Sequence, residues 1–146
     1  MNRFKPRPHL QAWLQKPVGG ALLETERQLL EERFQHVFKP RLAMLSFTSA
    51  SNAWLPQTLH HAFSLSAESC IESSAVSAYE HLPLSNESVD TVVLHHVLEF
   101  ATQPHQILRE AERVLAPGGK LMILAINPIS LLRASLGVAQ FTGSPQ

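Results

Sequence analysis

Cysteine is nearly absent from this sequence. Cys70 is the single cysteine among 146 residues. One cysteine cannot form an internal disulfide, so the sequence excludes a secreted domain that depends on disulfide bonds for its stability. The same count excludes a metal site built from a cluster of cysteines.

Long apolar runs are also missing. The longest uninterrupted one is Leu121–Ile126, far shorter than the roughly 20 residues that a membrane-spanning helix needs. The basic residues Arg3, Lys5 and Arg7 have no apolar stretch behind them, which is not the pattern of a signal peptide. The sequence therefore predicts a cytoplasmic protein with no membrane segment.

Charge is sparse and balanced. Charged residues make up 16% of the chain, and 12 basic residues balance 12 acidic ones. With 45% apolar residues, the chain has enough hydrophobic material for a core, so intrinsic disorder is not expected. A net charge of zero gives no general attraction to nucleic acid or anionic lipid, so we expect neither as a partner.

The chain contains segments of helical and of strand-like character within one domain. Its length suits a single domain, which we place at residues 21–133, after an irregular lead-in (1–20) and before a flexible tail (134–146). Apolar residues recur at helical spacing over Ala21–Phe38, and Pro104–Leu115 has the clearest helical pattern.

Five other segments have the length and composition of strands. They are Leu42–Phe47, His60–Leu65, Ala75–Tyr79, Thr91–Val97 and Lys120–Ile126. These segments lack the apolar–polar alternation of half-exposed antiparallel strands, which favours a parallel sheet buried on both faces. Together with the helices, they predict an α/β fold.

A series of motifs occupies the stretch from His81 to Gly119. Leu82-Pro83-Leu84 is followed by Val89-Asp90, by Leu98-Glu99 and by a helix that ends in Arg113–Gly119. In this order, the motifs resemble the middle of the class I S-adenosylmethionine-dependent methyltransferases, and in particular the type 11-like methyltransferases. The resemblance implies a Rossmann-like methyltransferase fold with a parallel sheet in the strand order 3-2-1-4-5.

The residues after the fifth predicted strand contain one more segment that is similar to the family, but they are fewer than family members usually have there. Asn127–Leu131 is similar to an Asn-Pro-x-Ser-Leu segment in a bacterial branch of the family. Family members usually add two strands after the fifth, but too few residues follow Ile126 for both, so we expect the fold to lack the final antiparallel strands. Lys120–Ile126 would then be an uncovered apolar edge. Because such edges pair with other chains, we expect either a homodimer through the strand-five edge or poor solubility, unless the tail after Asn127 folds back over the strand.

The resemblance also implies a function and a set of site residues. The cofactor would be S-adenosylmethionine, and the methyl group would pass directly to a small acceptor, with catalysis mainly by proximity. The positions that match the family's cofactor-binding segments are Phe47, Thr48, Ser49, Ser66, Glu68, Ala78, Tyr79, Glu80, Leu94 and His95.

Several of these positions depart from the family pattern. The segment 47–51 contains no glycine, the residue that lets the backbone approach the cofactor closely. Glu68 is the only acid near the end of the second strand, and the position that often holds an aspartate is Ala78. We therefore expect cofactor binding to be weak or lost. The alternatives are a non-catalytic binding or scaffold protein, or a fragment of a longer enzyme.

His95 and His96 close the fourth predicted strand, at the sheet edge where parallel sheets bind ligands. His96 is the candidate catalytic residue, as a general base that takes a proton from the acceptor. The alternative is a buried, hydrogen-bonded histidine. Since adjacent strand residues point to opposite faces, only one of the two is expected at the ligand edge. The same alternation argues against a metal site formed with His60 and His61, so we expect no metal.

Glu110 and Arg113 lie three positions apart in the predicted helix 104–115. This spacing brings two side chains together on a helix surface. We interpret them as a solvated surface pair.

Overall fold

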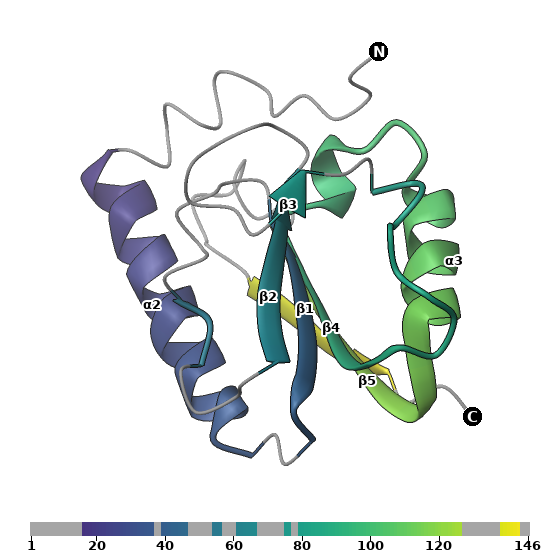
Figure 1. Cartoon of the computed structure of the whole chain (residues 1–146). Coiled ribbons are helices and arrows are strands. Elements are labelled where there is room, and N and C mark those ends of the chain that lie inside the picture. Colours follow the sequence, from purple (N-terminus) through teal and green to yellow (C-terminus); the bar gives the residue numbers. More distant parts are fainter. Residues whose placement is uncertain are drawn as a thin grey trace.

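One sheet with a helix on each face forms the framework of the molecule (Figure 1). The structure is a computed structural model that describes residues 16–36, 39–46, 54–56, 61–66, 75–76, 79–126 and 138–143. The helices are α2 (Pro17–Phe34) and α3 (Pro104–Val114), and a short 3-10 helix, η2 (Leu98–Phe100), precedes α3. The predicted α/β class is confirmed.

Within the described residues, the sheet has six strands in the order β3-β2-β1-β4-β5-β6. Strands β1 to β5 are parallel, which confirms the predicted order 3-2-1-4-5. The strand order reverses between β1 and β4. The bounds are β1 Arg41–Ser46, β2 His61–Ser66, β3 Ala75–Val76, β4 Val89–His95, β5 Leu115–Ile126 and β6 Val138–Gly143.

The sixth strand corrects three expectations. β6 pairs antiparallel with β5, from Val138 opposite Ile126 to Gly143 opposite Leu121. One final antiparallel strand is therefore present, and residues 138–143 are a strand where we expected a flexible tail. The chain beyond β5 is long enough to turn back and pair with it. Because β6 occupies this side of β5, the uncovered edge on which we based the homodimer does not exist along residues 121–126.

Helix α2 begins earlier than its hydrophobic pattern indicates. It starts at Pro17, where proline suits a helix because the first turn needs no backbone N–H donor. Residues 17–20 are therefore helical and do not belong to an irregular lead-in. In the part of the chain that the structure describes, no helix is both long and apolar enough to cross a membrane.

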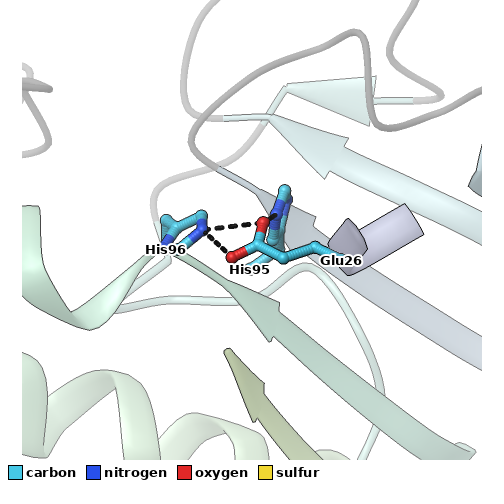
Figure 2. Close-up of side chains that lie close together, drawn as sticks. All are labelled: Glu26, His95 and His96. Atoms are coloured by element: carbon cyan, nitrogen blue, oxygen red, sulfur yellow. Dashed lines mark hydrogen bonds and ion pairs between the residues drawn. The ribbon is translucent and has the colours of Figure 1, made fainter. Parts of the chain in front are cut away.

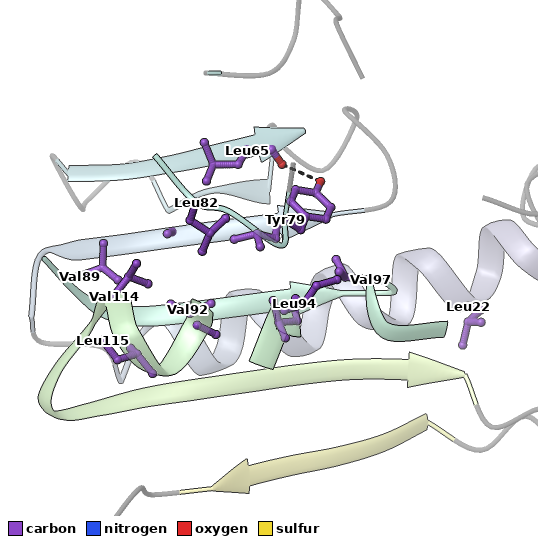
Figure 3. Close-up of a cluster of buried hydrophobic side chains, with 14 residues drawn as sticks. Leu22, Leu65, Tyr79, Leu82, Val89, Val92, Leu94, Val97, Val114 and Leu115 are labelled. Atoms are coloured by element: carbon purple, nitrogen blue, oxygen red, sulfur yellow. Dashed lines mark hydrogen bonds between the residues drawn. The ribbon is translucent and has the colours of Figure 1, made fainter. Parts of the chain in front are cut away.

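The sheet buries apolar side chains on both faces, which explains why its strands lack alternation. On one face, β1 and β4 residues pack with α3 in the cluster of Figure 3. On the other face, their neighbours pack with Leu30 and Phe34 of α2. The first set includes Ala43, Leu45, Val89, Val92, Leu94, Ile107, Ala111 and Val114, and the second includes Leu42, Met44 and Val93 together with Met122 and Leu124 of β5.

Glu110 and Arg113 fasten α3 to the loop before β4. The Arg113 guanidinium donates to the carbonyls of Leu82, at 3.0 Å, and Leu84, at 2.8 Å. The Glu110 carboxylate accepts the Leu82 amide at 2.8 Å and pairs with Arg113 at 2.8 Å. The interpretation as a solvated surface pair is therefore wrong, since both side chains satisfy loop backbone groups that would otherwise lack partners.

Asp90 joins β4 to β1 where both strands begin. Its carboxylate accepts hydrogen bonds from the Arg41 guanidinium at 2.9 and 3.1 Å and from the Arg41 amide at 3.3 Å. The Arg41 guanidinium lowers the pKa of Asp90. The only aspartate of the chain thus connects the first residues of β1 and β4. It lies at the opposite end of these strands from the edge where a ligand is expected.

Candidate functional site

β1 and β4 end side by side at the place where the strand order reverses. Ser46, the last residue of β1, lies opposite His95, the last residue of β4. Parallel α/β sheets bind ligands beyond the carboxyl ends of the strands at such a reversal. We call this place the switch-point edge. The Ser46 hydroxyl and His95 Nδ1 lie 2.9 Å apart there.

Glu26 reaches this edge from α2 and contacts both histidines (Figure 2). Glu26 Oε2 lies 2.9 Å from His95 Nε2, and Glu26 Oε1 lies 2.8 Å from His96 Nε2. His96 Nδ1 lies 2.7 Å from Oε2 of Glu99 in η2. The side chains of Glu26, His95 and His96 are fully buried. We call Ser46, Glu26, His95, His96 and Glu99 the histidine–glutamate cluster.

The backbone at His96 explains why two adjacent histidines meet one carboxylate. β4 ends at His95, and His96 has a φ of 53°, in the left-handed region that few non-glycine residues adopt. The His96 amide donates to the Leu124 carbonyl at 2.9 Å, which holds this turn to β5. Strand alternation therefore stops at His95, and the two ring centroids lie 4.6 Å apart. The prediction that the two side chains point to opposite faces is wrong.

Hydrogen bonding decides the charges in this buried cluster. Burial alone would raise the pKa of Glu26, but its hydrogen bonds with His95 and His96 lower that pKa to about 2. Burial alone would lower the pKa of His96, but its hydrogen bonds with Glu26 and Glu99 raise it to about 9. Burial lowers the pKa of His95. Near neutral pH, a Glu26 carboxylate therefore faces a protonated His96 and a neutral His95.

This arrangement does not suit His96 to the predicted role of general base. A base needs an available lone pair within reach of the proton that it removes. Both ring nitrogens of His96 lie within hydrogen-bond distance of carboxylates, and a protonated imidazole has no lone pair to offer. The alternative reading, a buried and hydrogen-bonded histidine, agrees better with the geometry.

Three of the predicted cofactor-binding residues lie at or next to the switch-point edge but serve the protein itself. The Tyr79 hydroxyl lies 2.6 Å from the Ser46 carbonyl and 3.0 Å from the Leu65 carbonyl, so it ties β1 to β2 (the Leu65 contact is dashed in Figure 3). Leu94 is a core residue. The His95 ring is engaged by Glu26 and Ser46 and has the Trp54 ring centroid 4.8 Å away.

Glu80 differs from these three. It is 5% exposed, and its backbone carbonyl accepts the side-chain amide of Gln106 at 3.4 Å. No hydrogen bond among the described residues involves its carboxylate, whose oxygens are not among the buried side-chain atoms that lack a partner.

Other predicted residues remain without a structural test. Phe47, Thr48, Ser49, Glu68 and Ala78, together with His60, lie outside the described residues. Ser66 is the last residue of β2, and only its backbone is described. His61 begins β2 opposite Arg41, so the structure places it at the other end of the sheet from His95.

Sequence reasoning missed Glu26. The residue lies four positions after Leu22 and four before Leu30, and both leucines are buried residues of the same helix, α2. A glutamate in the middle of an apolar helix face signals a buried partner, because an ionised side chain is rarely buried alone. This signal was available in the sequence, but the identity of the partners was not.

Comparison with known proteins places this geometry in context. A family profile described as "Methyltransferase domain" matches residues 49–123, just over half of the chain. The uncharacterized protein YafS of Escherichia coli is 50% identical over 52 residues, which are 36% of this chain and 22% of that protein. The ubiquinone/menaquinone biosynthesis C-methyltransferase UbiE of Rubrivivax gelatinosus is 38% identical over 72 residues, 49% of this chain and 29% of that enzyme. The chain thus spans less than a third of these relatives.

Solved structures show the same fold at low sequence identity. A methyltransferase of Thermotoga maritima, described as a possible histamine N-methyltransferase, has a TM-score of 0.51 and 20% identity over 73% of this chain and 58% of that chain. The putative methyltransferase in complex with the Trm112 activator of Haloferax volcanii has a TM-score of 0.56 and 18% identity, over 94% of this chain and 69% of that one.

Proposed function

The chain belongs to the methyltransferase-domain family, whose members include S-adenosylmethionine-dependent enzymes, and we propose that it binds S-adenosylmethionine weakly and methylates a small acceptor. The observation that carries this proposal is the meeting of Ser46 and His95 at the reversal of strand order, the position at which open α/β sheets hold their ligands. Zero net charge favours a small acceptor over a nucleic acid.

Glu80 fits the adenosyl part of this cofactor. The residue is 5% exposed and follows Tyr79, whose hydroxyl lies against the ends of β1 and β2, and the ribose hydroxyls and the adenine amino group are hydrogen-bond donors that a carboxylate can accept. We assign Glu80 the role of acceptor for one of these groups. When bound, S-adenosylmethionine supplies a methyl group activated by its sulfonium, and the residues of this chain contribute binding and orientation.

The affinity is expected to be low. The Tyr79 hydroxyl contacts two backbone carbonyls, and the His95 ring contacts Glu26 and Ser46, so neither is available to the cofactor without losing those contacts. Residues 47–51 also lack glycine. We therefore place the dissociation constant nearer the millimolar than the micromolar range.

A titration of the full chain with S-adenosylmethionine and S-adenosylhomocysteine, followed by amide chemical shifts, tests this proposal. We expect saturable shifts with both compounds. Glu80→Gln should weaken binding by about 10- to 100-fold, because a charge-assisted hydrogen bond is lost. Glu87→Gln, at an exposed turn position, is the matched control and should leave binding unchanged. Absence of saturable shifts with either compound would refute the proposal.

A non-catalytic binding or scaffold protein is the second candidate. It is favoured by the way the chain fills its own switch-point edge, where Tyr79 and the histidine–glutamate cluster make contacts within the protein. This candidate predicts binding of neither compound by a fully folded chain. Binding of both, with release of S-adenosylhomocysteine in the presence of small nucleophiles, would exclude it.

A further inference from the structure

Glu26, His95 and His96 present three potential metal-ligating atoms to one another. One ligand atom from each residue lies within 4.8 Å of the other two. The two imidazole Nε2 atoms face the same carboxylate, at 2.9 Å for His95 and 2.8 Å for His96, as Figure 2 shows. A zinc ion with ligand bonds near 2.0–2.1 Å holds its ligand atoms about 3.3 Å apart. The carboxylate would need to move a few tenths of an ångström away from each ring, and the two imidazole nitrogens, which lie within 4.8 Å of each other, would need to close to about 3.3 Å around the ion.

The fold builds this convergence from distant segments. Glu26 comes from a buried position of α2, and the histidines come from the end of β4. The positive φ at His96, held by the hydrogen bond to Leu124, brings its ring to the same carboxylate as the ring of His95. Residues in sparsely populated backbone conformations concentrate at ligand-binding and active sites.

The outer nitrogen of each ring has a side-chain partner, as it usually has in metal centres. His95 Nδ1 lies 2.9 Å from the Ser46 hydroxyl, and His96 Nδ1 lies 2.7 Å from the Glu99 carboxylate. In protein metal sites, such partners fix the tautomer and the orientation of the ring, so that Nε2 is presented to the ion. Here Nε2 of both rings faces inward and donates its proton to the Glu26 carboxylate in the metal-free chain. A bound ion would take the place of these protons, which are released to solvent, and each Nδ1–H would then donate to its outer partner.

Charge and donor type indicate which ion fits. Two carboxylates, Glu26 and Glu99, and two neutral imidazoles would be balanced by one divalent cation, and a buried site without net charge is the least costly. Two imidazole nitrogens and one carboxylate oxygen suit zinc, iron, cobalt or nickel, whereas magnesium and calcium prefer oxygen ligands. We propose that Glu26, His95 and His96 bind a divalent transition-metal ion of the zinc class. This proposal does not depend on the proposed function, because it uses none of the Glu80 contacts.

The test begins with the tag-free full chain, stripped of metal by a chelator that is then removed. Zinc is added in competition with a chromophoric chelator, and bound metal is counted by mass spectrometry after gel filtration. We expect one tightly held zinc per chain. Cobalt(II) in place of zinc should give the visible absorption bands that are typical of four- or five-coordinate cobalt. The ultraviolet band that a thiolate ligand causes should be absent.

Variants identify the ligands. Glu26→Gln and His96→Gln should each weaken zinc binding by at least about 100-fold, and Glu99→Gln should weaken it by about 10- to 100-fold, as outer partners do. The matched controls are Glu24→Gln on the exposed side of α2 and His105→Gln on the exposed side of α3, which should keep full affinity. Circular dichroism establishes that each variant is folded.

A measurement on the unaltered chain covers the case in which a ligand variant fails to fold. Long-range proton–nitrogen spectra of the eight histidines report each ring nitrogen. Zinc should shift the Nε2 signals of two histidines and leave the other histidines in place. The proposal is overturned if the unaltered chain takes up no stoichiometric zinc, if the two shifted histidines are not His95 and His96, or if the Glu24 and His105 controls lose zinc as the ligand variants do.

Discussion

Polar side chains connect β1 and β4 at both ends of the strands, and the two connections, which we call joints, differ in how far they are buried. At the start of the strands, Asp90 pairs with Arg41, whose side chain is 43% exposed. At their end, Ser46 and His95 belong to a cluster in which Glu26, His95 and His96 are fully buried. Water can replace a partner at the first joint but not at the second. A substitution in the buried cluster should therefore lower the free energy of unfolding more than one at the Arg41–Asp90 pair, although the same pairing of β1 with β4 connects both sites.

The largest effect is expected from Glu26→Ala. This change leaves a protonated His96 in the interior without its main counter-charge, and breaking a buried pair in this way costs about 3–5 kcal/mol. The free energy of unfolding, measured by urea denaturation at pH 7 with a chelator present, should fall by that amount.

Glu24→Ala is the control on the same helix. Glu24 is exposed and pairs with Arg27, so its loss should leave the urea midpoint nearly unchanged. If Glu26→Ala were as mild as this control, the buried cluster would not be the firmer of the two joints, and the contrast between the two ends of the strands would disappear.

Tyr79→Phe tests the neighbouring joint between β1 and β2. The ring stays, but the hydroxyl that contacts the Ser46 and Leu65 carbonyls is removed. Leaving buried acceptors without a donor costs about 1–3 kcal/mol. Urea denaturation measures the loss, and the amide shifts of residues 46 and 65 should change while those of β5 do not. An unchanged free energy of unfolding would mean that another donor replaces the hydroxyl.

Much of this framework was predictable from the sequence. The apolar strand segments and the helix 104–115 were recognisable because burial on both faces and a 3.6-residue period leave clear patterns. The parallel order 3-2-1-4-5 followed from the resemblance. β6 was missed because the residues after Ile126 are too few for the two strands that family members usually add. One strand is enough to cover the β5 edge, and the chain has room for one.

The polar contacts were less predictable, and the physical reason is the same in each case. The sequence shows that Glu26 lies on an apolar helix face, but its partners are 69 and 70 positions away. The histidine pair was misread because a single positive φ ended the alternation at His96. Glu110 and Arg113 were recognised as a pair, but their backbone partners lie 28 to 31 positions earlier. Long-range partners and single backbone angles leave little local signal.

Ser46→Ala sharpens the comparison within one strand, because Ser46 and Arg41 are the two ends of β1. The change removes one neutral hydrogen bond, to His95 Nδ1, and should lower the free energy of unfolding by about 1 kcal/mol. The same urea series measures it. A loss as large as that of Glu26→Ala would mean that Ser46, and not the carboxylate, is the central member of the cluster.

The smallest change in the free energy of unfolding is expected from Asp90→Asn, at the partly exposed joint between Asp90 and Arg41. Arg41 lowers the pKa of Asp90 in the folded protein, so the folded state holds that proton less tightly than the unfolded chain does. The stabilisation by the Asp90 carboxylate is therefore fully present above the unfolded pKa of about 4 and is lost as the pH falls through the lower folded value. The difference in urea midpoint between the unaltered chain and Asp90→Asn should shrink as the pH is lowered from 7 through this range.

Salt separates the two joints in the same experiment. Ions screen charges that face water but reach buried charges much less. Raising the sodium chloride concentration at pH 7 should reduce the effect of Asp90→Asn and leave the effect of Glu26→Ala largely intact. If both effects respond equally to salt, the Arg41–Asp90 pair and the Glu26–histidine cluster share one electrostatic environment, and burial does not distinguish the two ends of β1 and β4.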